Sequence, residues 1–137
     1  MTQQNSSNLP LQQILQQKRA AHAWECIEKV NAGIQKKYGS LVRGLPALIQ
    51  SDGLGQMLAF LKAKDKNKGN TEHIEAYSNI SNWINIEFGF TYKEDETLLE
   101  WLLTQETSMY RRATAEALAY LNWLKRFAEA KGWQDEE

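Results

Sequence analysis

Few side chains in this sequence stand at spacings that support catalysis or metal binding. His22 and Glu25 are three residues apart, as two metal ligands on one helix could be, but two ligands leave a metal site incomplete. A solvated helix face is therefore the preferred interpretation of this pair. Cys26 has no obvious base near it in the sequence, and His73 lies on an apolar stripe, where a hydrogen-bonded histidine at the core boundary is expected. We expect no catalytic residue, no metal and no cofactor.

Three adjacent carboxylates, Glu94, Asp95 and Glu96, open a stretch with helical spacing. Consecutive residues on a helix point about 100° apart, so these side chains do not converge on one metal ion. Their place at the start of a helix, where the helix dipole favours negative charge, explains them better. A small metal-dependent nuclease is therefore disfavoured.

Two glycines, Gly53 and Gly55, stand between apolar runs and raise the question of a phosphate-binding loop. Such a loop needs four residues between its glycines, then Lys-Ser or Lys-Thr, all after a strand, and this stretch has neither the spacing nor the strand. The pair instead predicts a tight corner between two helices. Asp52 would cap the second helix, Gly53 would allow the sharp reversal, and Gly55 would let a helix or an RNA backbone approach closely.

Composition restricts the class of protein. The 137 residues fit one domain, with an ordinary 42% of hydrophobic and 24% of charged residues, and the eight glycines and two prolines favour long helices. Of the five tryptophans, Trp24 and Trp101 are expected inside. The single cysteine suits a reducing compartment, and neither a secretory signal nor an apolar run near the roughly 20 residues of a membrane helix occurs. We expect a soluble, cytoplasmic protein without a membrane partner.

Apolar residues at three- and four-residue spacing predict helices throughout, and no alternation long enough for a sheet occurs. The fold class is therefore all-α, a single compact bundle of about six helices with long first and last helices. One domain is expected over residues 1–137, with a disordered tail over 1–8 and an acidic tail over 132–137. The expected helices are Leu9–Tyr38, Leu41–Ile49, Leu54–Lys64, one from Asn70 or Thr71 to Phe88, one within Glu94–Leu103, and Ser108–Lys131.

Glycines mark the expected helix ends at Gly39, Gly89 and Gly132. Gly44 and Pro46 are expected to interrupt the second helical stretch. On the first helix, one stripe of apolar residues runs through Ala20, Ala23, Ile27, Val30, Ile34 and Tyr38. Three further apolar residues fall off that stripe and need a bend, a second core or a partner: Leu11, Ile14 and Leu15.

Charge is distributed unevenly although the net charge is only −1. Basic segments flank an acidic one that runs over residues 72–106, so either a surface meets phosphate or the segments neutralise each other in space. On the expected first helix, Lys18, Lys29 and Lys36 would share the outer face, opposite the apolar stripe.

The last expected helix carries an unusual outer face. Arg112 and Arg126 lie opposite its core stripe, with Trp123 near them and Ala115 and Ala119 beneath. A solvent face rarely carries a tryptophan over alanines, and this combination suits a contact with protein or RNA. The alternative is a helix buried on two sides of the bundle. We assign Ala115, Ala119 and Trp123 to a protein interface.

Three strings together resemble a known family: "KRAAHAWECI", "KKYGSLVRGLPALIQSDGLGQMLAFLKAK" and "YRRATAEALAYLNWLKRFAEAKG". They are similar to the small subunit of the type III-B CRISPR effector, the Cmr (RAMP-module) complex. The resemblance runs through nearly the whole chain, and the middle string is its most specific part.

The resemblance implies an α-helical, non-catalytic subunit that stacks as a filament in antiviral defence. Its implied partners are neighbouring copies, the backbone and large subunits, and the duplex of crRNA and target RNA. Basic residues in the matching strings then become candidates for RNA binding: Arg19, Lys36, Lys37, Arg43, Lys62, Lys64, Arg111, Arg112, Lys125 and Arg126. The alternative function is a helical adaptor that binds protein through the tryptophan–alanine face and makes no RNA contact.

Overall fold

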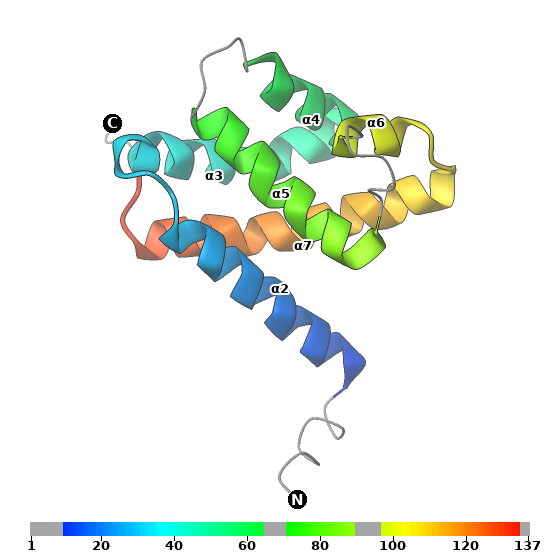
Figure 1. Cartoon of the computed structure of the whole chain (residues 1–137), viewed down its shortest axis with the longest axis horizontal. Helices are drawn as coiled ribbons and strands as arrows, with labels where there is room; N and C mark the ends of the chain where they lie inside the picture. The colour runs from blue at the N-terminus through cyan, green and yellow to red at the C-terminus, as the bar shows by residue number, and fades with distance from the viewer. Residues whose placement is uncertain (1–9, 65–70, 90–96, 135–137) are drawn as a thin grey trace, which may run out of the picture.

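A computed structural model describes residues 10–64, 71–89 and 97–134, and helices joined by short turns make up these ranges (Figure 1). It contains six α-helices and one short 3₁₀ helix, and no strand occurs in the described part, which confirms the all-α class. The elements are α2 (Leu11–Glu28), η1 (Ala32–Ile34), α3 (Gln35–Asp52), α4 (Leu54–Ala63), α5 (Glu72–Phe88), α6 (Leu98–Leu103) and α7 (Thr107–Ala130).

The core forms where α3, α5 and α7 pack against one another. Helix α4 adds to α3 and α5, α6 covers α4 and α5, and α2 lies on α7 and α5. The N-terminal half of α2 projects away from the body (Figure 1), and Leu11 at its start is 84% exposed. Among the described helices, none combines the length and the apolar character that crossing a membrane requires.

The prediction of one continuous helix over Leu9–Tyr38 is wrong. Helix α2 ends at Glu28, and α3 begins at Gln35 after a turn that contains η1. The Asn31 side chain accepts a hydrogen bond from the Gly33 N–H at 2.8 Å, which caps η1 and turns the chain. Val30 remains buried at this turn. Since Lys36 belongs to α3, the common outer face expected for Lys18, Lys29 and Lys36 on one helix does not exist.

Helix α3 runs through the two residues expected to interrupt it, Gly44 and Pro46, and through the expected helix end at Gly39. A mid-helix proline removes a backbone N–H and usually kinks or ends a helix. Here the side chains of Leu45, before the proline, and Ile49, after it, are buried in the core. Their burial offsets the backbone hydrogen bond that Pro46 cannot donate. The predicted ends Leu41 and Ile49 are therefore both wrong.

The corner between α3 and α4 is confirmed at Gly53, whose φ of 94° lies in the region that favours glycine. The predicted cap is wrong, because Asp52 is the last residue of α3 and no side chain caps α4. The Gly55 N–H donates to the Tyr110 hydroxyl at 2.8 Å, and a Cβ on Gly55 would lie 3.0 Å from that oxygen. The residue that approaches Gly55 is thus part of α7 in the same chain.

The boundaries of α4, α5 and α7 agree with the sequence to within two residues. Helix α6 ends at Leu103 as predicted, but it begins at Leu98 and not at Glu94. Thr71 caps α5 by accepting from the Ile74 N–H, and Gly89 ends α5 in the left-handed conformation. Thr97 and Glu100 form a reciprocal capping box on α6. The expected tail over 1–8, the carboxylates of residues 94–96 and the last three residues of the acidic tail lie outside the described residues.

The tryptophans divide between the core and the surface. Trp101 is buried as predicted, whereas Trp24 is 40% exposed, which makes that prediction wrong. Trp83 and Trp133 are also buried, and Trp133 packs directly against α3 at Gly39. Trp24 lies at the flank of the buried stripe formed by Ala23 and Ile27, and it packs against Phe127 at the edge of the α2–α7 contact instead of in the core.

Candidate functional site

A polar cluster holds α2 on the body of the molecule. Arg19 of α2 donates two hydrogen bonds to the Glu116 carboxylate of α7, at 2.5 and 2.9 Å, and both side chains are largely buried. Trp83 of α5 donates its indole N–H to the same carboxylate at 2.8 Å. Burial raises the pKa of Glu116, but the hydrogen bonds from Arg19 and Trp83 outweigh it, so the pKa is lowered overall. The carboxylate therefore joins three helices in its ionised form.

A second cluster lies beside the first. His22 Nδ1 is 2.7 Å from the Tyr120 hydroxyl, which donates to Cys26 Sγ at 3.3 Å. Burial lowers the pKa of His22, with Glu25 opposing and Lys29 reinforcing the shift. Burial also raises the pKa of Cys26, so the thiol stays protonated near neutral pH. His22 is thus a base close to Cys26, which the sequence did not indicate. Its ring nitrogen is engaged in a hydrogen-bonded contact between helices.

Stability should fall as the pH drops, because His22 is neutral in its folded contact. Its folded pKa is lower than the unfolded value of 6.5, so the unfolded chain binds the proton first. This contribution is complete above pH 6.5 and is lost as the pH falls through the folded pKa. Burial also lowers the pKa of His73, so His73 contributes to the same loss of stability at low pH.

We expect His22→Asn to reduce the loss of unfolding free energy between pH 8 and pH 5.5, as measured by urea unfolding at the two pH values. If the variant loses as much unfolding free energy as the parent, His22 does not have this role.

Aromatic rings form a line along the outer edge of the α2–α7 contact. Trp123 lies 5.3 Å from Phe127 between ring centroids, and Phe127 lies 5.0 Å from Trp24. Lys131 caps the line, with its ammonium 5.0 Å from the Trp24 ring centre and 3.0 Å from the Glu28 carboxylate. The line joins the two helices at the surface and fixes the orientation of its rings.

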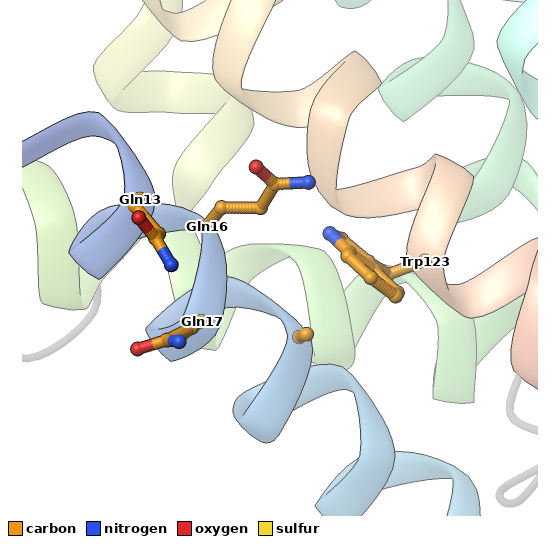
Figure 2. A pocket seen from close by; sticks show the side chains of 5 residues that line it. Gln13, Gln16, Gln17 and Trp123 are labelled. Carbon is orange, nitrogen blue, oxygen red and sulfur yellow. The ribbon is translucent and has the colours of Figure 1, made fainter. Parts of the chain in front are cut away.

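Two hollows share Trp123 as a wall. The smaller, about 280 Å³, is lined from α2 by Gln13, Gln16, Gln17 and Ala20. Figure 2 shows the Gln16 side chain extending from α2 toward the Trp123 indole, which reaches across from α7. The larger hollow measures about 540 Å³, and its walls are Gln16, Arg19, Ala119, Asn122, Trp123 and Arg126.

The structure brings together only some of the predicted site residues. Arg19, Ala119, Trp123 and Arg126 line the larger hollow, but the Arg19 guanidinium is occupied by Glu116. Ala115 is exposed one helical turn before Ala119. The glutamines of α2 were missed by the sequence analysis, although the apolar residues beside them that fell off the core stripe were a signal of a second surface.

The other predicted basic residues are dispersed. Lys36, Lys37 and Arg43 are exposed on α3, and none forms an ion pair with another residue in the described ranges. Three more extend over aromatic rings: Lys62 over Tyr77, Lys64 over Phe60 and Arg112 over Phe88, at 5.3 to 5.7 Å from the ring centres. Arg111 is exposed and Lys125 is half-buried, both on α7.

The titratable side chains form no site for a bound metal in the described part of the chain, since no three His, Cys, Asp or Glu residues group as ligands there. No third ligand among these residues joins His22 and Glu25, the two residues whose spacing suits metal ligands on one helix. The histidine instead contacts Tyr120.

Comparisons with known proteins point to one family. The family model described as CRISPR-associated protein (Cas_Cmr5) matches residues 15–131. The CRISPR system Cmr subunit Cmr5 of Thermus thermophilus is 31% identical over 112 residues, which cover 81% of this chain and 90% of that protein. The X-ray structure of a CRISPR-associated Cmr5 family protein from the same organism has a TM-score of 0.68 and 28% identity, and the match covers 84% of this chain and 95% of that one. The resemblance of the three strings is confirmed: the chain belongs to the Cmr5 family of CRISPR-associated proteins.

Proposed function

We propose that this chain is a non-catalytic structural subunit of a cytoplasmic type III-B Cmr complex, where it stacks with neighbouring copies and contacts the backbone of the guide–target RNA duplex. The family and the similar Cmr subunit support membership of the complex. The two polar clusters support a structural role, because each joins α2 to α7 and so holds α2 in place. Arg19 bonds to Glu116 in the first cluster, and His22 bonds to Tyr120 in the second.

The observation that carries the RNA contact is the basic face of α3. Lys36 and Arg43 are seven residues apart, so they share one face of the helix about 10 Å apart along its axis. Lys37 lies beside them, and all three are exposed without an ion pair inside the described chain. Long cationic side chains of this kind bind phosphates without reading sequence, which leaves specificity to guide pairing.

Helix α7 offers the contact with protein subunits. Ala115 is exposed on α7 and lines neither hollow, so its small side chain allows a neighbouring helix to approach closely there, whereas Ala119, one turn on, lines the larger hollow. Arg111 and Arg112 precede this face and Lys125 follows it. The proposed partners on this side are neighbouring copies and the backbone and large subunits.

Charge reversal on α3 tests the RNA contact. We expect the combined change Lys36→Glu, Lys37→Glu and Arg43→Glu to weaken binding of the guide–target duplex by the assembled complex about tenfold or more. Each lost phosphate contact should also reduce the slope of log affinity against log salt by about 0.7 to 0.9. Filter binding across a salt series measures both quantities.

The matched control is Lys18→Glu, an exposed lysine of α2 outside the proposed set. It should leave affinity and slope close to those of the unchanged complex. If the triple variant assembles normally and binds RNA with the original affinity and slope, the basic face of α3 has no role in RNA binding.

A further inference from the structure

We propose that the two hollows around Trp123 bind unpaired RNA bases, which stack on its indole ring. This inference rests on the proposed function in taking RNA as the ligand, and it adds a second mode of contact. The basic face of α3 would hold paired backbone, whereas the α2–α7 surface would take nucleotides that leave the duplex.

The Trp123 ring is held in position before any ligand arrives. Phe127 packs against it with ring centres 5.3 Å apart and a tilt of 35°, and Trp24 packs edge-on against Phe127. The indole is only half-buried, and it lines both hollows. A fixed, accessible aromatic surface is what base stacking requires, because every base has an aromatic face.

Amide side chains surround the ring. Gln13, Gln16 and Gln17 reach the smaller hollow from α2, and Asn122 lines the larger one from α7 (Figure 2). Each amide carries both a donor and an acceptor, so it can pair with the mixed donor and acceptor edges of any base. All four are exposed. Volumes of about 280 and 540 Å³ are close to the roughly 300–1,000 Å³ of small-ligand sites.

The charge of the lining fits a nucleotide. Arg126 lines the larger hollow with a 77% exposed side chain, and its one ion pair among the described residues, with Glu129, is long at 3.9 Å. No carboxylate lines either hollow among the described side chains. Arg126 can therefore bind the phosphate of a nucleotide whose base stacks on Trp123, as in other single-strand sites.

The same lining argues against a protein segment as the occupant. Cores of protein contacts are enriched in aromatic and other apolar side chains, and of the charged residues only arginine is enriched there. Here one aromatic ring and two alanines are accompanied by four amides and two arginines. Because Arg19 is already bonded to Glu116, a protein helix would have to satisfy the four amides and Arg126, whereas a base and its phosphate supply matching groups.

Binding of two RNA probes to the full-length chain at low ionic strength tests the proposal. The probes are a short single-stranded oligoadenylate and a blunt RNA duplex, each followed by fluorescence anisotropy. We expect Trp123→Leu to weaken oligoadenylate binding about ten- to hundredfold, the usual effect of losing a base–aromatic stack, and to leave duplex binding unchanged. Trp123→Phe should weaken oligoadenylate binding less than Trp123→Leu does, because phenylalanine keeps an aromatic ring for stacking.

Two further variants separate stacking from damage to the fold. Gln16→Ala removes an exposed amide and should also weaken oligoadenylate binding selectively, whereas Ile86→Ala shortens an exposed apolar side chain on α5 and should change neither probe. Equal binding of oligoadenylate by all variants, or equal losses on both probes, would overturn the proposal. Photocrosslinking from position 16 to protein alone within the assembled complex would also overturn it. Failure of the α3 contact would appear separately, as unchanged duplex binding by the triple charge variant.

Discussion

Gly39→Ala should lower the free energy of unfolding by about 3 kcal/mol, the upper part of the range for overpacking a core. Gly39 is buried in the second turn of α3, where the chain that follows α7 crosses it. A Cβ there would overlap the Trp133 carbonyl oxygen and lie 2.7 Å from the Trp133 Cβ. Because one of the atoms is backbone, α3 and the end of the chain would have to move apart. Urea unfolding at pH 8 measures the loss.

Gly44→Ala is the matched control in the same helix. No described atom lies within 4 Å of the Cβ it would add, so only helix propensity changes. Alanine is favoured over glycine inside a helix by about 1 kcal/mol, and the variant should be equally or more stable than the parent. If Gly39→Ala were as harmless as Gly44→Ala, the packing of Trp133 on α3 would be contradicted.

Arg19→Met should cost about 2 to 4 kcal/mol of unfolding free energy, because it leaves the largely buried Glu116 carboxylate without its cation. Methionine keeps most of the length of the side chain, so the loss would be electrostatic more than steric. The Trp83 N–H would remain as a hydrogen-bond donor to Glu116. Thermal and urea unfolding both measure the effect.

Two controls define what Arg19 does. Glu116→Gln added to Arg19→Met removes the unpaired charge and should recover part of the stability. Arg19→Lys keeps the charge but cannot make two parallel hydrogen bonds, so a clear loss should remain. If Arg19→Met were as stable as the parent but bound RNA poorly, Arg19 would be an RNA contact and not a structural residue.

Periodicity predicted the helices well where one apolar face meets one core. The stripe predicted for α7 begins at Tyr110, which is half-buried, and its other members are fully buried: Ala113, Ala117, Leu121, Leu124 and Ala128. Each end of the helix lies within one residue of the prediction. Capping signals at Thr71 and Thr97 also follow from residue type. These features are local, so a single sequence determines them.

The break between α2 and α3 could not be seen from periodicity. Residues on both sides of it, such as Ile27 and Tyr38, face the same core, so the apolar spacing continues across the turn. Asn31 and Gly33 were the available signal. The pairing of Arg19 with Glu116 joins positions 97 residues apart, and no local pattern indicates it. The hollows around Trp123 likewise combine residues of α2 and α7 that are far apart in the sequence, so no local pattern indicates them.

Purification of the tagged chain from its native cell, with ultraviolet crosslinking before lysis, tests whether the chain is a subunit of the Cmr complex that contacts RNA. We expect a set of Cmr subunits with a short guide RNA, and crosslinks from this chain to RNA as well as to protein. Crosslinks to protein alone would contradict the RNA contact and leave a helical adaptor. Recovery of the chain without other Cmr subunits would contradict its role as a subunit of the complex.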